Sequence, residues 1–458
     1  MTDIKRIYSL LLAMGIFFSV LTSYNTQLLF SMDNDTFWHV KTGEYIYTHR
    51  EIPSADVFSW YGAENNFKWI NHEWLYDLLI FAVHSIYGLK GVAIFTSIIA
   101  GLVFLLLYIL MEIRSRNTFL SLFLACIAIA GMVNFLSPRP QTISYCLLLL
   151  MAIALEKKKW PGVLPIIIIG VNVHGGFYPM YILLLTYYLW REKPWLVLVS
   201  PLLVMLNPYG WEIITYPFRV QMYPEFTKYI MEWTATKLTG QGHEYNLITY
   251  IVLFLLIFNK KIKKEDALFS LFIIVQTFMA ARHITFLYLL VIPVLTPYIA
   301  QNNIFTDLKE AFEKKLKYVY VVTLLVLLSL AVYDTDFNKP VNTSNFPDKK
   351  VIIFIKENNL KRIYNMYDDG GFLIYNDIKP MIDGRADIFA PIYNDTNLFK
   401  DYFEADLLMK DYKKFLDNYM INYVIINKNR PIYQAMQHSV FFKNIYEDDL
   451  YVIVQYIN

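Results

Sequence analysis

The chain has 458 residues, of which 56% are hydrophobic and only 17% are charged. Soluble domains carry about 25% charged residues, so this composition indicates an integral membrane protein. The net charge of +2 is too small to suggest a nucleic-acid partner. The two cysteines, Cys126 and Cys146, lie inside apolar stretches and predict neither a disulfide framework nor a metal site.

Apolar segments recur along the first three quarters of the chain. The first, at 7–30, follows Lys5 and Arg6 and lacks a small-residue cleavage site, so it predicts a retained membrane helix rather than a signal peptide. Further segments lie at 91–113, 118–136, 142–156, 161–174, 177–190, 195–206, 246–259, 267–281, 284–299 and 318–334. Several fall below the ~20 residues that span the hydrocarbon, so their ends are approximate.

The distribution of basic residues predicts how the chain crosses the membrane. One more stretch, 74–87, is short and contains Asp77 and His84. If this stretch does not cross, every basic cluster falls on the cytoplasmic side, as the positive-inside rule requires. The clusters are Lys5-Arg6, Arg114/Arg116, Lys157-Lys158-Lys159, Arg191/Lys193, Lys260-Lys261/Lys263-Lys264 and Lys314-Lys315/Lys317. We therefore predict an interfacial helix at 74–87, about 11 crossings, a cytoplasmic N-terminus and an extracytoplasmic C-terminus.

These crossings predict a transmembrane domain over 1–334. Two long outer loops interrupt it, at 31–90, which includes the interfacial helix, and at 207–245. Residues 335–458 have a mixed, polar composition and are numerous enough for a small domain. Strands are expected near 362–366, 381–383, 423–426 and 450–455, and a helix within 407–419. This alternation predicts a small α/β domain on the extracytoplasmic face.

The first outer loop opens with the acidic motif Asp33-Asn34-Asp35-Thr36-Phe37-Trp38-His39. A carboxylate just outside a membrane helix can act as a general base, and a pair of carboxylates can hold a divalent cation. Alternatively, Asp33 or Asp35 merely caps the helix that follows. Because His39, His72 and Glu73 lie in the same loop, we favour a functional site.

Two arginines lie at predicted outer boundaries of the membrane. Arg139 stands between prolines in Ser137-Pro138-Arg139-Pro140-Gln141, and the prolines stop a helix from continuing through it. A guanidinium there can bind a phosphate through two nitrogens, or it can simply reach the interface, and both interpretations stay open. Arg282 and His283 interrupt an apolar stretch with hardly any loop. Charges so close to the bilayer usually mark a site, so Arg282 is a second candidate for phosphate binding.

Other polar groups have a structural interpretation of similar weight. His174 is followed by Gly175 and Gly176, which permit close approach of a ligand, although a lone histidine at a helix end is more often structural. Asp383-Gly384-Arg385 follows an expected strand, where loops commonly bind ligands, but Asp-Gly also forms ordinary turns. The sequence has no Walker loop, Gly-x-Gly-x-x-Gly, zinc spacing or Gly-x-Ser-x-Gly, which argues against an ATPase, a Rossmann enzyme or a serine hydrolase.

A long outer loop that follows the first helix and opens with an acidic motif resembles the GT-C superfamily of polytopic glycosyltransferases. These enzymes use polyprenyl-phosphate-linked sugars as donors. Aligned by its aromatic neighbours, Asp35 looks like the family's catalytic aspartate, and Asp33 looks like its companion. Residues 52–59 and 383–387 resemble a bacterial branch with largely unassigned substrates. The more usual Asp-Glu pair is absent, because Thr36 follows Asp35.

The resemblance implies a glycosyltransferase of the bacterial cell membrane with about 11 transmembrane helices. Its sugar would pass from a polyprenyl-phosphate donor to an extracytoplasmic glycan, lipid or protein, with Asp35 as general base. The predicted substrate-binding residues are His39, His72, Glu73, Arg139, His174, Arg282, His283, Asp383 and Arg385. The cofactor stays unknown; a divalent cation is one option, with Asp33 and Asp35 as its ligands. The alternative function is a non-catalytic transporter or assembly protein for envelope polysaccharide.

Overall fold

The computed structural model describes residues 32–237, 244–258, 261–315, 318 and 341–457. The predicted span 7–30 and all but the first residue of the predicted span 318–334 lie outside these described residues. The described chain is mainly helical and carries a small sheet near its C-terminus. The predicted combination of apolar helices with a C-terminal α/β region is therefore confirmed.

The chain divides into two compact units. Among the described residues, the first unit comprises 90–214 and the described part of 224–340. The second unit comprises 32–89, 215–223 and 341–457. Most of the predicted first outer loop thus belongs with the C-terminal residues. The domain boundary at residue 334 stays a prediction.

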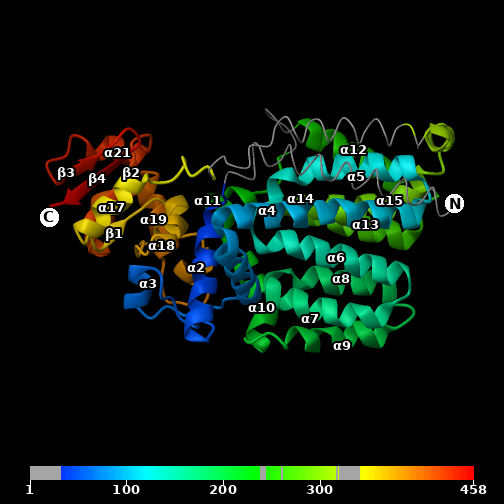
Figure 1. The fold of residues 1–458 in the computed structure, drawn as a ribbon, viewed down its shortest axis with the longest axis horizontal. Coiled ribbons are helices and arrows are strands. Elements are labelled where there is room, and N and C mark those ends of the chain that lie inside the picture. The colour runs from blue at the N-terminus through cyan, green and yellow to red at the C-terminus, as the bar shows by residue number, and fades with distance from the viewer. Residues whose placement is uncertain (1–31, 238–243, 259–260, 316–317, 319–340, 458) are drawn as a thin grey trace. The chain divides into compact units, whose positions relative to one another are not determined.

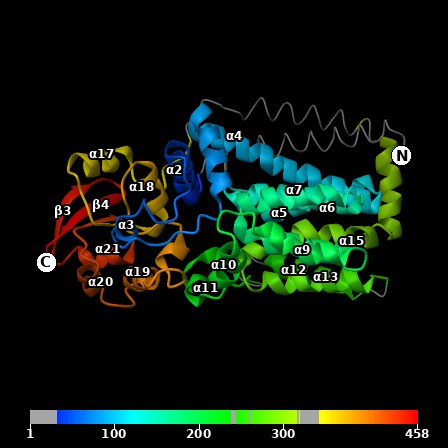
Figure 2. The ribbon, with the colours of Figure 1, turned by 90° about the horizontal axis from the view of Figure 1, so that it is seen from below.

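The first unit is a helix bundle. Helices α6, α7, α8 and α9 run side by side (Figure 1). Figure 2 shows α6, α7 and α9 of this bundle from below. Beyond α4, the helices of this unit include α5 (Thr118–Met132), α6 (Pro140–Glu156), α7 (Val163–Val173), α8 (Tyr178–Leu189), α9 (Pro194–Val204), α11 (Pro224–Tyr229), α12 (Glu244–Ile257), α13 (Lys264–Thr277), α14 (Ile284–Phe286) and α15 (Ile292–Ile299). Residues 303–315 are also helical. Helix α10 (Trp211–Gln221) contributes residues to both units.

Three helical stretches among the described residues are long and apolar enough to cross a membrane. They are Trp74–Ser115, Thr118–Phe135 and Ala281–Ile299, and shorter apolar helices cover Pro140–Glu156, Trp160–Val173 and Pro194–Val204. This composition fits a membrane protein. The count of about 11 crossings and the sidedness of the chain stay predictions.

Helix α4 (Trp74–Ser115) is interrupted at two residues. Tyr87 and Gly88 depart from helical backbone angles, and Gly88 has a φ of 61°, a region that glycine enters without steric cost. Its first part belongs to the second unit and its last part to the first unit. The sequence separated 74–87 from 91–113 at this glycine, although the interfacial position of the first part stays a prediction.

One end of the first unit is held by a polar network around Arg114. This guanidinium donates to Glu156 at 2.6 Å and to Tyr188 at 2.9 Å, which links the C-terminal ends of α4, α6 and α8. Asp266 extends the network to α13 and α15 by accepting hydrogen bonds from Tyr187 and Tyr298. Helix α6 has 17 residues, about 25 Å at 1.5 Å per residue, so Arg139 lies at the opposite end of this helix.

The second unit contains a four-stranded sheet with the order β1-β2-β4-β3. Its strands are β1 (Ile363–Tyr364), β2 (Tyr423–Asn427), β3 (Phe442–Glu447) and β4 (Tyr451–Tyr456). β1 pairs with β2 in parallel, and β4 pairs with β2 and with β3 in antiparallel fashion. The helices of this unit, besides the first part of α4, are α2 (Asn34–His49), α3 (Trp60–Glu64), α17 (Lys349–Glu357), α18 (Gly370–Tyr375), α19 (Leu398–Asp406), α20 (Tyr412–Asn418) and α21 (Pro431–Met436).

The strand predicted at 381–383 is wrong. Met381 and Ile382 are buried, as expected for apolar residues of a strand. However, they pair with no strand. The amide side chain of Asn365 takes that place. It accepts from the Met381 backbone N–H at 2.7 Å and donates to the Ile382 carbonyl at 2.9 Å. A side chain therefore satisfies the backbone that a neighbouring strand would otherwise satisfy.

Helix α2 carries the acidic motif into the second unit. Its Phe37 is fully buried and meets the rings of Phe346 and Phe372 edge-on at 5.0 and 5.1 Å. The ideal Cβ of Gly371 would lie 2.3 Å from the Asn34 carbonyl oxygen, so α18 approaches the start of α2 closely. The first-loop motif and the C-terminal residues therefore share one packed core.

Gly43 sets how closely α2 packs on the first turn of α4. A Cβ at this position would lie 2.0 Å from the backbone oxygen of Asp77, which cannot move aside cheaply. We expect Gly43→Ala to destabilise the protein by about 1–3 kcal/mol, because overpacking a site that cannot relax costs about that much. The measurement is the thermal unfolding midpoint of the purified protein.

Gly162→Ala is the matched control for this substitution. Gly162 has a φ of −70°, and no atom lies within 4 Å of its ideal Cβ. It should leave the midpoint unchanged. Equal midpoints for the two alanine variants would contradict the close packing of α2 on α4.

Candidate functional site

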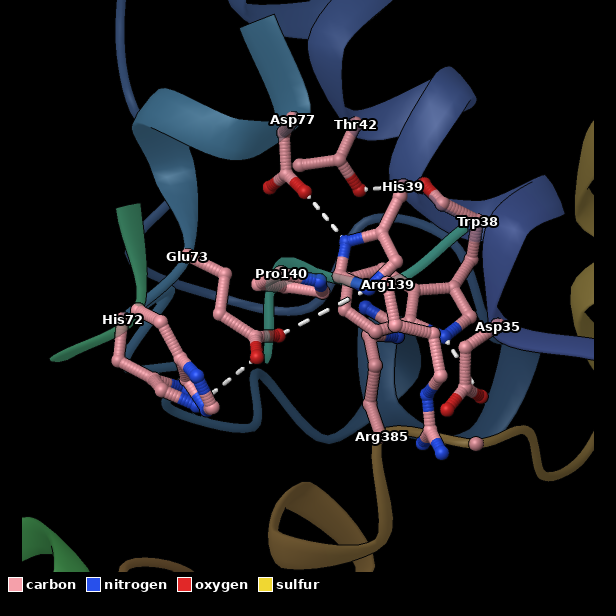
Figure 3. A network of polar contacts seen from close by, with 12 residues as sticks. Asp35, Trp38, His39, Thr42, His72, Glu73, Asp77, Arg139, Pro140 and Arg385 are labelled. Carbon is pink, nitrogen blue, oxygen red and sulfur yellow. Dashed lines mark hydrogen bonds and ion pairs between the residues drawn. The ribbon is translucent and has the colours of Figure 1, made fainter. Parts of the chain in front are cut away.

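The start of α2 separates the two carboxylates of the acidic motif. Asp33 is the N-cap, and its Oδ1 accepts from the Asp35 backbone N–H at 3.0 Å. Asp35 lies in the first turn, where its Oδ1 accepts from the Trp38 indole nitrogen at 3.0 Å (Figure 3). The Asp35 side chain is 8% exposed. Asp33 therefore caps α2, whereas the Asp35 carboxylate accepts a hydrogen bond from the Trp38 indole.

The Asp35 carboxylate lies directly against the backbone of Gly384. An ideal Cβ on Gly384 would lie 1.8 Å from Asp35 Oδ1, closer than any real contact. Glycine is therefore required here by a close approach rather than by an unusual backbone angle. The structure brings together two motifs that lie almost 350 residues apart in the sequence.

Arg385 fixes the turn that contains Gly384. Its guanidinium donates to Asp383 at 2.7 and 2.8 Å and to Asp56 at 2.8 Å. It also lies 4.6 Å from the centre of the Trp69 ring, and it is 3% exposed. Burial alone would lower the pKa of Arg385, but the two carboxylates outweigh burial and raise it, so the charge is kept. Substrate contact by Asp383 and Arg385 stays a prediction.

A chain of acids and imidazoles runs from α4 to the end of the first loop. His39 Nδ1 lies 2.6 Å from the buried Asp77 carboxyl group, and Asn71 donates to the same group at 2.9 Å. His39 Nε2 then lies 3.9 Å from Glu73, which in turn lies 3.4 Å from His72 Nε2 (Figure 3). Three residues predicted as substrate-binding, His39, His72 and Glu73, therefore form one connected group.

His72 connects this group to the C-terminal part of the second unit. Its ring lies 4.2 Å from the ring of Tyr216. Burial would lower the pKa of His72, but the nearby carboxylates of Glu73 and Asp387 raise it overall. Burial raises the pKa of Asp387, while the charge of His72 opposes that shift. The arrangement favours a positive His72 between two acids.

In the first unit, the two arginines predicted to bind phosphate share one carboxylate. Arg139 Nη1 donates to Glu232 Oε2 at 3.0 Å, and Arg282 Nη1 lies 3.7 Å from Glu232 Oε1. The Arg282 guanidinium also lies 3.4 Å from the centre of the Trp233 ring. Two predicted site residues from distant parts of the sequence are therefore neighbours.

The two remaining predicted histidines, His174 and His283, also lie in the first unit, but they contact other residues. His174 follows α7, with its Nδ1 3.4 Å from the Ser144 hydroxyl of α6. His283 directs its Nδ1 at the Gln276 carbonyl oxygen, 3.0 Å away on α13. Substrate binding by either histidine stays a prediction.

The donor types of Asp33 and Asp35 suit a hard divalent cation, which prefers carboxylate oxygens. One oxygen of each already accepts a hydrogen bond from the protein. A carboxylate has further lone pairs, so these bonds are compatible with a bound cation. A metal role for the pair stays a prediction.

The comparisons with known proteins identify a fold and no family. No protein-family model matches the sequence, and no curated protein matches it. A solved structure that is similar is the archaeal oligosaccharyltransferase AglB from Archaeoglobus fulgidus, in complex with an inhibitory peptide and a dolichol-phosphate. The TM-score is 0.52 at 11% sequence identity, and the match covers 93% of this chain and 70% of AglB.

The chain has an AglB-like fold. The apolar helices agree with a membrane location. At such low identity the similarity establishes the fold alone.

Three acidic residues of these clusters were not among the predicted site residues. Asp77 was noted only as a charge in an ambiguous apolar stretch, and Asp56 only as part of a motif. A carboxylate within an apolar helix is a signal that could have identified Asp77, because such a charge needs a partner. Glu232 gives no comparable signal, since its role depends on contacts with two distant arginines.

Asp369 is a buried acid in the motif Asp368-Asp369-Gly370-Gly371, which leads into α18. It is 1% exposed, and its Oδ1 lies 3.1 Å from the Tyr451 hydroxyl, which donates to it. Burial raises the pKa of Asp369 to about 8; the hydrogen bond from Tyr451 opposes the shift and the charge of Asp368 adds to it. Burial therefore favours the protonated form of this carboxyl group in the native protein.

Asp369 should make the folded state less stable as the pH rises. The unfolded chain ionises this group near pH 3.8, whereas the native chain holds the proton to about pH 8. Its stabilising contribution is fully present below pH 3.8 and is lost as the pH rises towards 8. We expect Asp369→Asn, which cannot ionise, to reduce the loss of unfolding free energy between pH 5 and pH 8 by a few kcal/mol.

Chemical denaturation of the purified protein at the two pH values measures this effect. The exposed carboxylate Asp395, changed to Asn, is the control and should leave the pH dependence as in the original chain. The same pH dependence in Asp369→Asn as in the unmodified protein would show that Asp369 does not hold its proton.

Gly384→Ala should destabilise the second unit because its Cβ would collide with the Asp35 carboxylate. The collision disappears if Asp35 is also shortened. We therefore expect Gly384→Ala to cost about 1–3 kcal/mol alone and much less when combined with Asp35→Ala. A double-mutant cycle of unfolding free energies measures this coupling, and strictly additive effects would contradict the contact.

Proposed function

We propose that the protein is a membrane glycosyltransferase that moves a sugar from a polyprenyl-phosphate-linked donor to an extracytoplasmic acceptor. The observation that carries the proposal is the similarity of 93% of the chain to an oligosaccharyltransferase fold. That enzyme was observed with a dolichol-phosphate and a peptide, which supports a lipid-linked donor and an acceptor of envelope glycan, lipid or protein here. We place the activity at the outer face of a bacterial cell membrane.

Asp35 is the proposed general base. The Trp38 indole holds one oxygen of its carboxylate, and the Gly384 backbone packs against the same oxygen, so its orientation is fixed before substrate binds. The acceptor nucleophile would attack the anomeric carbon while its proton passes to Asp35. The bond from that carbon to the phosphate oxygen breaks, and polyprenyl phosphate leaves. One positioned base and a stabilised leaving group suffice for such a step.

Arg139 and Arg282 are the proposed phosphate ligands. Guanidinium groups pair with phosphate oxygens through two nitrogens and neutralise the charge that the leaving group gains. Both arginines are partly exposed, at 22% and 35% of the side chain, so an anion from outside the bundle can reach them. A divalent cation, if the enzyme uses one, would be held by Asp33 and Asp35 and would supply positive charge that stabilises a leaving phosphate.

The other predicted residues have supporting roles in this proposal. The group of His39, His72 and Glu73 would contact the substrate, with Asp77 orienting the His39 ring. Because Asp77 is buried and accepts from His39 Nδ1, the Nε2 atom of that ring is directed towards Glu73. His174, His283 and Asp383 stay candidates for substrate contact.

Asp35→Asn is the direct test of the base. The amide keeps the size of the side chain and can still accept from Trp38, so the fold should persist, but it cannot take a proton. We expect the transfer rate to fall by about 10² to 10⁴, the usual contribution of a general base. The measurement is transfer from radiolabelled polyprenyl-phosphate sugars in membranes that contain the protein.

Two controls accompany this variant. Asp395→Asn removes an exposed carboxylate of the same unit and should transfer at the original rate. The unfolding midpoint of Asp35→Asn should match that of the unmodified protein. An undiminished rate in Asp35→Asn would sink the proposed mechanism.

A further inference from the structure

The contact of Arg139 and Arg282 with Glu232 bears on how an anion would bind. We infer that the Glu232 carboxylate occupies the arginine pair in place of a phosphate and is displaced when a phosphate group binds. The inference rests on the proposed phosphate-binding role of the two arginines. In addition, the inference makes Glu232 a competitor of the donor phosphate for the two arginines.

The ion pairs of Glu232 have the geometry of a replaceable contact. Glu232 Oε2 lies 3.0 Å from Arg139 Nη1, and Glu232 Oε1 lies 3.7 Å from Arg282 Nη1. The longer separation exceeds a hydrogen bond. The three side chains are 22–35% exposed, and ion pairs with such access to water contribute little stability. A ligand that makes better contacts can therefore displace the carboxylate.

The charges match such an exchange. Two guanidinium groups and one carboxylate carry a net charge of +1. A phosphodiester carries one negative charge, as the carboxylate does, so the exchange leaves the charge of the cluster unchanged. Phosphate oxygens also fit the fork of donors on a guanidinium better than a single shared oxygen does.

Backbone and ring contacts hold the segment around Glu232. Glu232 lies in the short helical turn Met231–Trp233, and the Ala281 backbone N–H donates to the Thr234 carbonyl at 2.7 Å. The Trp233 ring, 9% exposed, supports Arg282 at 3.4 Å. These contacts keep Arg282 in position without the carboxylate, because a cation over an indole is itself stabilised.

Binding of phosphate probes to purified full-length protein tests the inference without any turnover. Farnesyl phosphate tests a lipid phosphate, and inorganic phosphate tests the phosphate group alone. We expect Glu232→Gln to bind farnesyl phosphate roughly two- to fivefold more tightly, since it removes a competing partly exposed ion pair. If Glu232→Gln binds both probes more tightly, the arginine pair recognises the phosphate group itself. If it binds only farnesyl phosphate more tightly, the pair recognises a lipid phosphate.

Two further variants keep the result interpretable. Glu225→Gln removes a carboxylate from the same loop that pairs with Lys228, so it matches the change in net charge and should leave binding unchanged. Glu232→Asp keeps the charge but shortens its reach, and it should tighten binding less than Glu232→Gln does. The Glu232→Asp variant also provides the comparison if the Gln variant folds poorly.

The opposite result would assign Glu232 a structural role. If the carboxylate is needed to hold two like charges together, Glu232→Gln binds the probes more weakly. Unchanged binding, equal tightening in Glu225→Gln, or no binding of either probe to any variant also overturns the inference. The two proposals can fail separately. If Glu232→Gln binds the phosphate probes more tightly but the protein transfers no sugar, the inference holds and the proposed function is wrong. If transfer depends on Asp35 but Glu232→Gln leaves probe binding unchanged, the proposed function holds and the inference is wrong.

Discussion

The second unit depends on one buried cation, Arg385, held between Asp56 and Asp383. A charge this deeply buried is tolerated only when its partners are complete, and here two carboxylates and an aromatic ring surround it. Asp56 comes from the first loop and Asp383 from the C-terminal region, so the same ion pairs that satisfy the charge join two distant parts of the chain. They also fix Gly384 against Asp35, which gives the proposed base its position.

Two polar clusters of the first unit lie at opposite ends of α6. Arg114 and Glu156 belong to one cluster, which ties helix ends together, and Arg139 belongs to the other, which contains the shared carboxylate Glu232. The two clusters differ in accessibility. Arg114 is 10% exposed and pairs with Glu156 at 2.6 Å, whereas the Arg139 cluster is more open and more loosely paired. These properties favour a structural role for the first and ligand exchange for the second.

The sequence predicted the features that local pattern determines. Apolar length indicated the apolar helices, and short apolar runs indicated β2 and β4. The role of Asp35, which the family resemblance implies, stays a prediction. The strand at 381–383 was mistaken because the Asn365 side chain replaces a partner strand, which no local pattern shows. Packing of the first loop with the C-terminal residues, and the pairing of Glu232 with two arginines, are contacts between distant segments, so one sequence alone could not reveal them.

The most direct measurement is whether the purified protein releases polyprenyl phosphate from a lipid-linked sugar. A panel of radiolabelled polyprenyl-phosphate sugars, each incubated with the protein and candidate acceptors, separates transfer from simple binding. The account predicts that at least one donor yields free polyprenyl phosphate together with a labelled acceptor. Binding of donors without release from any of them would contradict a transferase and would favour a transporter or an assembly protein.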